Sequence, residues 1–527
     1  MDVRVEEARK SLRRPSISSL ASEIDPELLR AVPLDVCLQS CGGHWSTNKA
    51  SDDFNLSQQV EMIDSFLSHD WKTKRWLKTL TLLLYFNSVP AAWANVIACI
   101  FSCVLIIFGS LPGGWLTGTL FTHATFWFFF AFWQRIRGLF KKNMVFLDRL
   151  CIAQHDQQLK KSGILGLGGF LSKSRRLVVL WSPRYFTRLW TAFEIACFLR
   201  HGEERAKNIE FAPAGMGPLI LCFSVFEALL VACFQGLIVQ DVQVRLGEID
   251  PFLEQQEDRY WDFIVAVFIV AAPALVLVIP VSLYFGTLQM EALLKLKEQL
   301  GGFKIRDSQC SCCDMDHCHP ESGEELLCDR KLVFQTLKRW FPDETTPEGH
   351  LDKFDEMVRT QLRGFVQEIL GSGAPHFRYV VANCAPPLLG IFCQYVYMAV
   401  NDPFGWTAEG WMIGWFQIPP LVFLAFWEML LCWRIGARLR HRVPLWIVFP
   451  VLVIIFLPIN NLLWFQYAVM KYTFGHDFQW PVVGSLAFMW FVVALPYIWE
   501  YSPVICKASQ RGARFRPALW RSESNGN

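Results

Sequence analysis

The stretch SFLSHDWKTKRWLKTLTLLLYF, residues 65–86, begins as a short apolar strand and ends as the approach to a membrane. Phe66, Leu67 and Ser68 precede a polar stretch, as at the end of a strand in a soluble α/β domain, whereas the last residues are mostly apolar. A single strand needs neighbours to bury it. We therefore expect a membrane hairpin to interrupt a soluble domain, whose remainder resumes after the hairpin.

The composition indicates a membrane protein that carries soluble parts. Of the 527 residues, 53% are hydrophobic, 15% are aromatic and only 19% are charged, and the mean hydropathy is +0.26. A soluble chain of this length would expose too much apolar surface with these proportions. The expected partner is thus the lipid bilayer. A net charge of +2 gives no overall field that would favour nucleic acid, so no nucleic-acid partner is expected.

Eight apolar runs approach or exceed the roughly 20 residues that a helix needs to cross the hydrocarbon core. They cover residues 89–110, 114–133, 218–239, 261–285, 379–400, 410–432, 444–470 and 480–501. Arg and Lys gather at 135–142, 434–442 and 507–521. The eight runs predict an α-helical polytopic integral membrane protein. The positive-inside rule places both of its termini in the cytosol.

These spans divide the chain into seven parts. We expect a disordered cytosolic tail at 1–58, an α/β domain split between 59–88 and 134–217, and a first membrane hairpin at 89–133. The third and fourth spans lie within 218–285, a cytosolic helical segment covers 286–378, the last four spans lie within 379–501, and a basic cytosolic tail covers 502–527.

The α/β domain is predicted from strands that alternate with helices. Beyond the first hairpin, apolar runs at 145–147 and 177–180 and the stretch 208–213 are typical of strands, and a helix is expected from about Thr187. This alternation predicts a parallel sheet. Ligands of such sheets bind beyond the carboxyl ends of the strands. These ends hold Ser68 and Asp148.

The series resembles a Toll/interleukin-1 receptor (TIR) domain, which implies a flavodoxin-like parallel sheet. The matching stretches are 66–68, 146–148, 178–186 and 188–196, and SHDW, LDRLCIAQ and RLWTAFEIA are most similar to the multi-span TIR-like proteins of protists, notably dinoflagellates. Two features depart from the family pattern. Thr191 stands where a Cys often follows the Trp, and a compact TIR domain has no membrane hairpin.

The resemblance implies a membrane-anchored signalling or scaffold protein that assembles by TIR–TIR self-association. Some TIR domains instead cleave NAD at the nicotinamide glycosidic bond, using a Glu in a W-x-x-x-E arrangement that Trp190 and Glu194 match. A carboxylate can stabilise an oxocarbenium-like transition state. Ser68, Asp148 and Trp190 are then candidate contacts for NAD. The same Trp and Glu occur in TIR domains that only assemble, so both alternatives stay open.

Polar residues inside the apolar runs raise a third alternative, a channel or transporter with a regulatory TIR-like module. Glu227 lies in the middle of the third run, and Asn460 and Asn461 lie in the seventh. Such residues usually face a partner or a cavity. Hydrogen bonding between helices is the simpler explanation, and it is the one we favour.

The segment CSCCDMDHCH, residues 310–319, gathers thiols and imidazoles. It holds Cys310, Cys312, Cys313, His317, Cys318 and His319, and Cys328 follows shortly after. Thiolate and imidazole are ligands of Zn²⁺. Because the spacing is irregular, a redox-sensitive patch, palmitoylated cysteines and an inert loop remain as alternatives. Amphipathic helices predicted at 330–340 and 351–370 could pack on the TIR-like layer or on a partner, and packing on the layer is the expected case.

Overall fold

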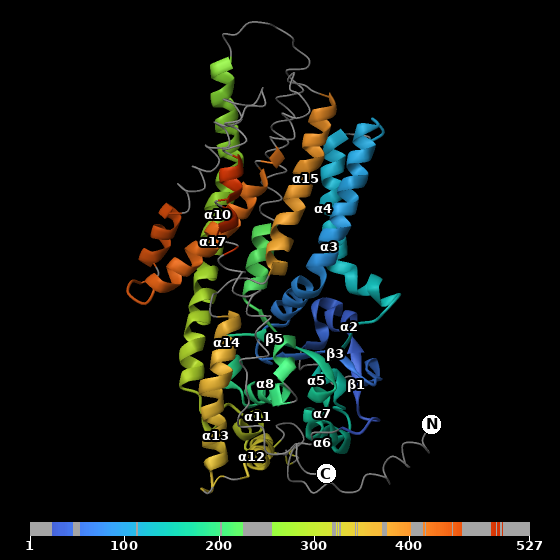
Figure 1. Cartoon of the computed structure of the whole chain (residues 1–527), viewed down its shortest axis with the longest axis vertical. Coiled ribbons are helices and arrows are strands. Elements are labelled where there is room, and N and C mark those ends of the chain that lie inside the picture. Colours follow the sequence, from blue (N-terminus) through green and yellow to red (C-terminus); the bar gives the residue numbers. More distant parts are fainter. Residues whose placement is uncertain are drawn as a thin grey trace.

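The computed structural model is mostly helical and elongated, with a small mixed sheet at one end and long helices extending from it (Figure 1). It describes residues 24–45, 53–111, 114–200, 203–224, 256–318, most of 323–370, 377–401, most of 415–455 and several positions between 486 and 498. The basic tail expected at 502–527 lies outside the described residues.

Six strands form one sheet in the order β2-β1-β4-β3-β5-β6. The neighbouring strands β4, β3, β5 and β6 run parallel to one another. Strand β1 pairs antiparallel with both β4 and β2. The sheet is therefore mixed rather than wholly parallel. The strands are β1 (Arg30–Pro33), β2 (Gln58–Gln59), β3 (Ile63–His69), β4 (Met144–Phe146), β5 (Ser174–Trp181) and β6 (Ile209–Pro213).

The pairing of β3 with β4 closes the sheet across an inserted helical hairpin. Phe66 lies opposite Phe146 in the parallel register, and their rings stack with centroids 4.5 Å apart. Between them in the sequence lie α3 (Arg75–Ile107) and α4 (Gly114–Gly138), which extend from the sheet side by side (Figure 1). A helical hairpin therefore lies between two neighbouring strands of one sheet, whereas its passage through a membrane as a hairpin and the TIR-like fold stay predictions.

The hairpin begins earlier than expected. The apolar run at 89–110 suggested a separate soluble segment before it, but α3 is continuous from Arg75 and passes through Pro90. Leu82 and Tyr85, in the first third of α3, are buried in the same hydrophobic core as the sheet. The helix that enters the apolar region is therefore also the helix that follows β3.

Three described helices are long and apolar enough to cross a membrane. They are Arg75–Ile107, Arg378–Asn401 and Ile418–Leu439. The first is α3, the second lies within α15 (Phe377–Asn401), and the third is α17 (Ile418–Leu439). The second expected run lies within α4, and the fourth lies within α10 (Gln256–Gly301). The third, seventh and eighth runs lie largely outside the described residues.

The prediction of a disordered tail at 1–58 is wrong for residues 24–45 and 53–58. Val32 of β1 pairs with Val145 of β4, and Ala31, Val32 and Leu34 are at most 1% exposed. Burial of this short apolar stretch against β4 outweighs the polar character of its surroundings. Residues 1–23 and 46–52 lie outside the described residues.

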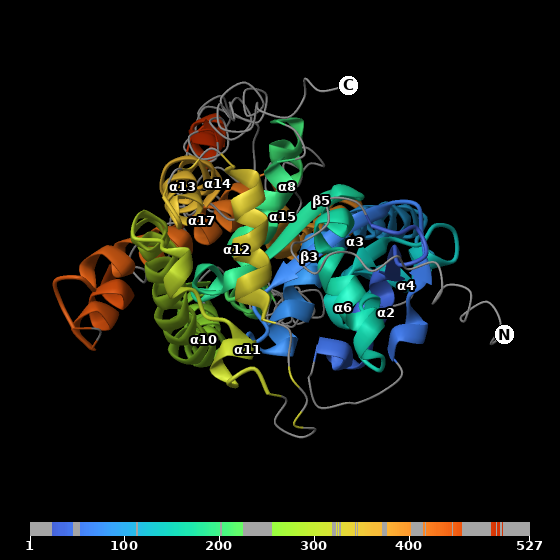
Figure 2. The same ribbon diagram turned by 90° about the horizontal axis from the view of Figure 1, so that it is seen from below.

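The two amphipathic segments pack on the sheet domain, as predicted. They form α12 (Asp329–Trp340), α13 (Gly349–Met357), a π-helical turn (Val358–Leu362) and α14 (Arg363–Leu370). Trp340 of α12 stacks on Phe193 of α8 (Leu189–Arg200), with ring centroids 5.1 Å apart. Seen from below, β3 and β5 lie between α12 and α6 (Gln157–Leu165) (Figure 2).

Replacing Phe146 with Ala should destabilise the sheet domain by about 3–5 kcal/mol, because the substitution leaves a cavity against Phe66. The measurement is the fraction of detergent-solubilised protein that stays folded on heating. Phe140→Ala is the matched control, since Phe140 is 88% exposed whereas Phe146 is 1% exposed. Equal unfolding temperatures for the two variants would contradict a core formed at the β3–β4 pair.

Candidate functional site at the carboxyl edge of the sheet

Polar residues converge where the parallel strands end. Ser68 and His69 close β3, Asp148 starts α5 (Asp148–Cys151) just beyond β4, and Ser182 follows β5. Parallel neighbouring strands end at the same edge of a sheet, so these residues of three strands lie at one edge. Ser68 is 1% exposed and Ser182 is 8% exposed. The predicted site residues Ser68 and Asp148 thus share one edge.

A hydrogen-bonded chain joins Ser68, Glu194 and Tyr185 at this edge. The Ser68 hydroxyl donates to the Glu194 carboxylate, and Ser68 Oγ lies 2.5 Å from the Tyr185 hydroxyl oxygen. Because Ser68 has one proton to donate, Tyr185 is the donor of the second bond. Glu194 lies on α8 and Tyr185 lies in the 3-10 turn Tyr185–Thr187 after β5. Tyr185 is fully buried, whereas Glu194 is partly exposed.

The two carboxyl groups of the edge titrate in different ranges. Burial raises the pKa of Glu194 to about 8, a rise that the Ser68 hydrogen bond opposes and the charge of Asp148 assists. Burial also raises the pKa of Asp148, to about 6, against the Arg149 backbone bond and the charge of Lys78. Near pH 7, Glu194 is therefore largely protonated while Asp148 is largely ionised. A pair separated in this way can hold and release a proton.

Buried Asp70 ties the end of β3 to the elements that carry Tyr185 and Glu194. Its carboxylate lies 3.2 Å from the guanidinium of Arg184 and 3.7 Å from that of Arg188. It also accepts a hydrogen bond from the backbone N–H of Lys72 at 3.2 Å. Asp70 is 1% exposed. The ion pairs therefore fix the loop after β5 and the start of α8 against β3.

Lys78 brings the α3–α4 hairpin into the site. It lies near the start of α3 and is fully buried, with its ammonium 5.2 Å from the centroid of the Trp45 ring and 5.5 Å from that of Trp71. Cation–π attraction stabilises this placement. Trp71 in turn donates its indole N–H to Asp148 at 3.0 Å. Sequence reasoning missed Lys78, because a lysine ahead of an apolar run looks solvent-exposed.

Trp190 has a different partner from Glu194, although the two residues are one helical turn apart. Its indole N–H donates to the carboxylate of Asp329 at 3.0 Å, and Asp329 is the first residue of α12. Trp190 therefore ties α8 to α12, while Glu194 ties α8 to β3. The two residues of the W-x-x-x-E pattern thus bond to two different elements, β3 and α12.

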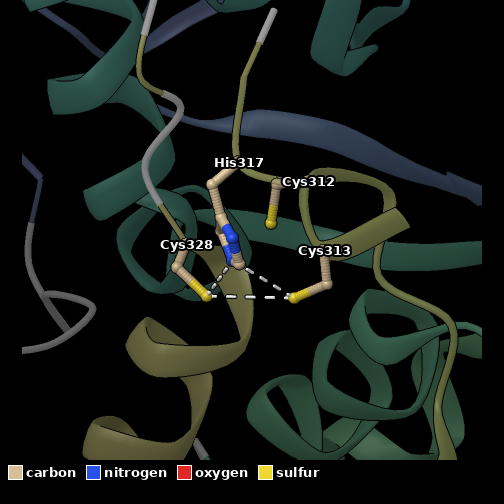
Figure 3. A group of neighbouring side chains, drawn as sticks. All are labelled: Cys312, Cys313, His317 and Cys328. Atoms are coloured by element: carbon tan, nitrogen blue, oxygen red, sulfur yellow. Dashed lines mark hydrogen bonds between the residues drawn. The ribbon is translucent and has the colours of Figure 1, made fainter. Parts of the chain in front are cut away.

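The thiols and imidazole of the 310–328 segment form a group beside Asp329. Cys312, Cys313, His317 and Cys328 have ligand atoms that all lie within 4.8 Å of one another (Figure 3). Cys310 instead groups with Cys312 and Asp329. Cys318 is exposed and belongs to neither group. His319 lies outside the described residues, as do Glu227, Asn460 and Asn461 of the apolar runs.

Comparison with known protein families, curated proteins and solved structures finds no match for this chain. The resemblance to TIR domains stays a prediction that rests on the quoted motifs.

Glu194→Gln should raise the unfolding temperature relative to the natural protein at pH 8.5 and raise it much less at pH 5.5. The raised pKa of Glu194 means that the folded state binds more protons than the unfolded state from the ordinary glutamate pKa up to about 8. Stability is therefore full below that window and falls as the pH rises through it. The expected difference is about 1–3 kcal/mol, since partial exposure weakens the effect.

The measurement is thermal unfolding of both proteins at each pH. Glu298→Gln, an exposed position on α10, controls for the loss of one carboxylate. A gain that is equal at both pH values would show that the Glu194 substitution acts through packing rather than through its proton.

Proposed function

We propose that the protein is a membrane-anchored signalling or scaffold protein, in which the α3–α4 hairpin couples the bilayer to a cytosolic TIR-like domain that assembles with other copies. The observation that carries this proposal is the insertion of the hairpin between the adjacent strands β3 and β4. Helix α3 begins at Arg75, shortly after β3 ends at His69. Because this connection is short, a tilt of α3 would pull on β3 and strain its place in the sheet.

The contacts of α3 extend this coupling to the site. Lys78 lies against Trp71, whose indole holds Asp148. A displacement of α3 relative to the sheet therefore moves a buried charge relative to a carboxylate that titrates near pH 6. A domain attached by a long flexible linker would not respond in this way.

Assembly is supported by an exposed edge of the sheet. Both residues of β2, Gln58 and Gln59, are exposed, and β2 is the first strand of the order. The backbone N–H of Val60 donates inward to the carbonyl of Leu29. Since N–H directions alternate along a strand, the N–H of Gln59 points away from β1. Such an edge can pair with a strand of a second copy.

The internal contacts of Glu194 favour a structural role over catalysis. Its carboxylate accepts from Ser68, so it holds α8 on the sheet. With a pKa of about 8, it lacks most of the negative charge near pH 7 that would stabilise an oxocarbenium-like transition state. Trp340 stacks on Phe193 of the same helix, and this packing of α8 against α12 also favours a structural role.

The second candidate function is cleavage of NAD. It is favoured by the partial exposure of Glu194 at the carboxyl edge of the sheet, where ligands of such sheets bind. A bound nicotinamide ring carries a positive charge, which would favour the ionised form of Glu194. The two functions differ in what the purified protein does to NAD.

Assembly is tested with full-length protein in nanodiscs that each hold one copy. Because the discs separate the membrane helices, association between discs requires contacts of the soluble domain. We expect filled discs to associate as the concentration rises, as measured by sedimentation velocity, and Gln59→Pro to weaken association by about tenfold while Gln59→Ala does not. Filled discs that sediment as single particles at all concentrations would refute assembly.

Catalysis is tested by following nicotinamide release from NAD by the same protein. We expect no release above that of Glu194→Gln. Turnover by the natural protein that Glu194→Gln abolishes and Trp190→Phe retains would replace the scaffold proposal with the hydrolase.

A further inference from the structure

We propose that Cys312, Cys313, His317 and Cys328 bind one Zn²⁺ ion, which ties Cys312, Cys313 and His317 to the start of α12. The four side chains point toward one another from α11 (Ser311–Asp314), the turn after it and the residue before α12 (Figure 3). Three thiolates and one imidazole form a common ligand set of structural zinc. This inference does not depend on the proposed function.

The spacing of the ligand atoms suits a tetrahedral ion. The Sγ atoms of Cys313 and Cys328 lie 3.9 Å apart, and His317 Nε2 lies 3.6 Å from Cys313 Sγ and 3.2 Å from Cys328 Sγ. Tetrahedral bonds of about 2.3 Å to sulfur and about 2.0–2.1 Å to nitrogen place neighbouring ligand atoms about 3.5–3.8 Å apart. Cys312 completes the set within the 4.8 Å that encloses all four ligand atoms.

The backbone turns sharply to deliver the histidine. Asp316 has φ 50° and His317 has φ 59°, a left-handed conformation that non-glycine residues adopt at a cost. The backbone N–H of His317 donates to the carbonyl of Cys312 at 2.8 Å. This turn folds the chain back so that the imidazole meets the sulfur atoms. Metal ligation offsets the cost of the turn and gives a physical reason for it.

A backbone group outside the ligand set also supports the site, as in structural metal centres. The backbone N–H of Asp329 donates to Cys312 Sγ at 3.3 Å, the kind of outer bond that orients a thiolate ligand. Four protein ligands leave no open position for substrate. Binding the ion releases one proton from each of the three thiols, with no change in oxidation state. The ion is therefore assigned a structural role.

The ion would act on α8 through one residue. Asp329 follows Cys328 directly, and its carboxylate receives the indole N–H of Trp190. Fixing Cys328 thus fixes the start of α12 and the position of the Trp190 partner. Removal of the ion should loosen α12 from α8, where Trp340 covers Phe193.

The test measures zinc in the full-length protein, purified under reducing conditions, by inductively coupled plasma mass spectrometry. We expect one zinc per chain, and at least tenfold weaker retention against a chelator in Cys328→Ser. Cys318→Ser is the matched control, because Cys318 is an exposed thiol of the same segment outside the group. It should keep the full zinc content.

A second measurement covers the case in which Cys328→Ser does not fold. Cobalt replaces zinc in the natural protein, and we expect the intense visible bands of tetrahedral Co²⁺ with sulfur-to-cobalt charge transfer in the near ultraviolet. Hydrogen exchange should show that a chelator exposes 329–341 without unfolding β3 to β5. Natural protein without zinc or cobalt bands, a disulfide between Cys313 and Cys328, or equal zinc loss in both serine variants would overturn the proposal. None of these readouts depends on assembly or on NAD.

Discussion

The parallel pairing of β3 with β4 constrains the rest of the structure. Parallel neighbours cannot be joined by a tight turn and need a crossover connection, which is usually a single helix. Here the crossover is the α3–α4 hairpin, so its two helices must leave and return to the same sheet. The stacked rings of Phe66 and Phe146 lie at this junction. Any motion of the hairpin is therefore a motion of a sheet connection.

The strands of this sheet were predictable where their own residues carry the signal. The apolar runs at 145–147 and 177–180 are buried whatever their partners, and both lie in strands. Strand β2 consists of two glutamines, and only pairing with β1 defines it. The sequence does not predict the start of α3, because Lys78 and Asn87 are polar residues of types that are usually exposed to solvent. Their burial depends on partners elsewhere, including the Phe130 carbonyl, which accepts from Asn87 at 2.8 Å.

The site was predictable in its location but not in its bonds. The ends of β3 and β4 and the W-x-x-x-E pattern placed Ser68, Asp148 and Glu194 near one edge. The contact of Tyr185 with Ser68 and that of Trp190 with Asp329 join segments whose relative position only the tertiary fold sets. Cys328 joins the cysteine and histidine group for the same reason, since the sequence between it and His317 has no recognised ligand spacing.

Helix α8 is the element on which these contacts meet. Glu194 bonds to Ser68 on the sheet side, and Trp190 bonds to Asp329 on the α12 side. The hairpin acts on the sheet side through β3, and the cysteine and histidine group acts on the α12 side through Asp329. A close-packed helix that makes both contacts cannot move with one partner without straining its bond to the other. The two contacts are therefore mechanically linked through one helical turn, and under the proposed function α8 is the element at which a signal from the bilayer would meet the contacts of α12.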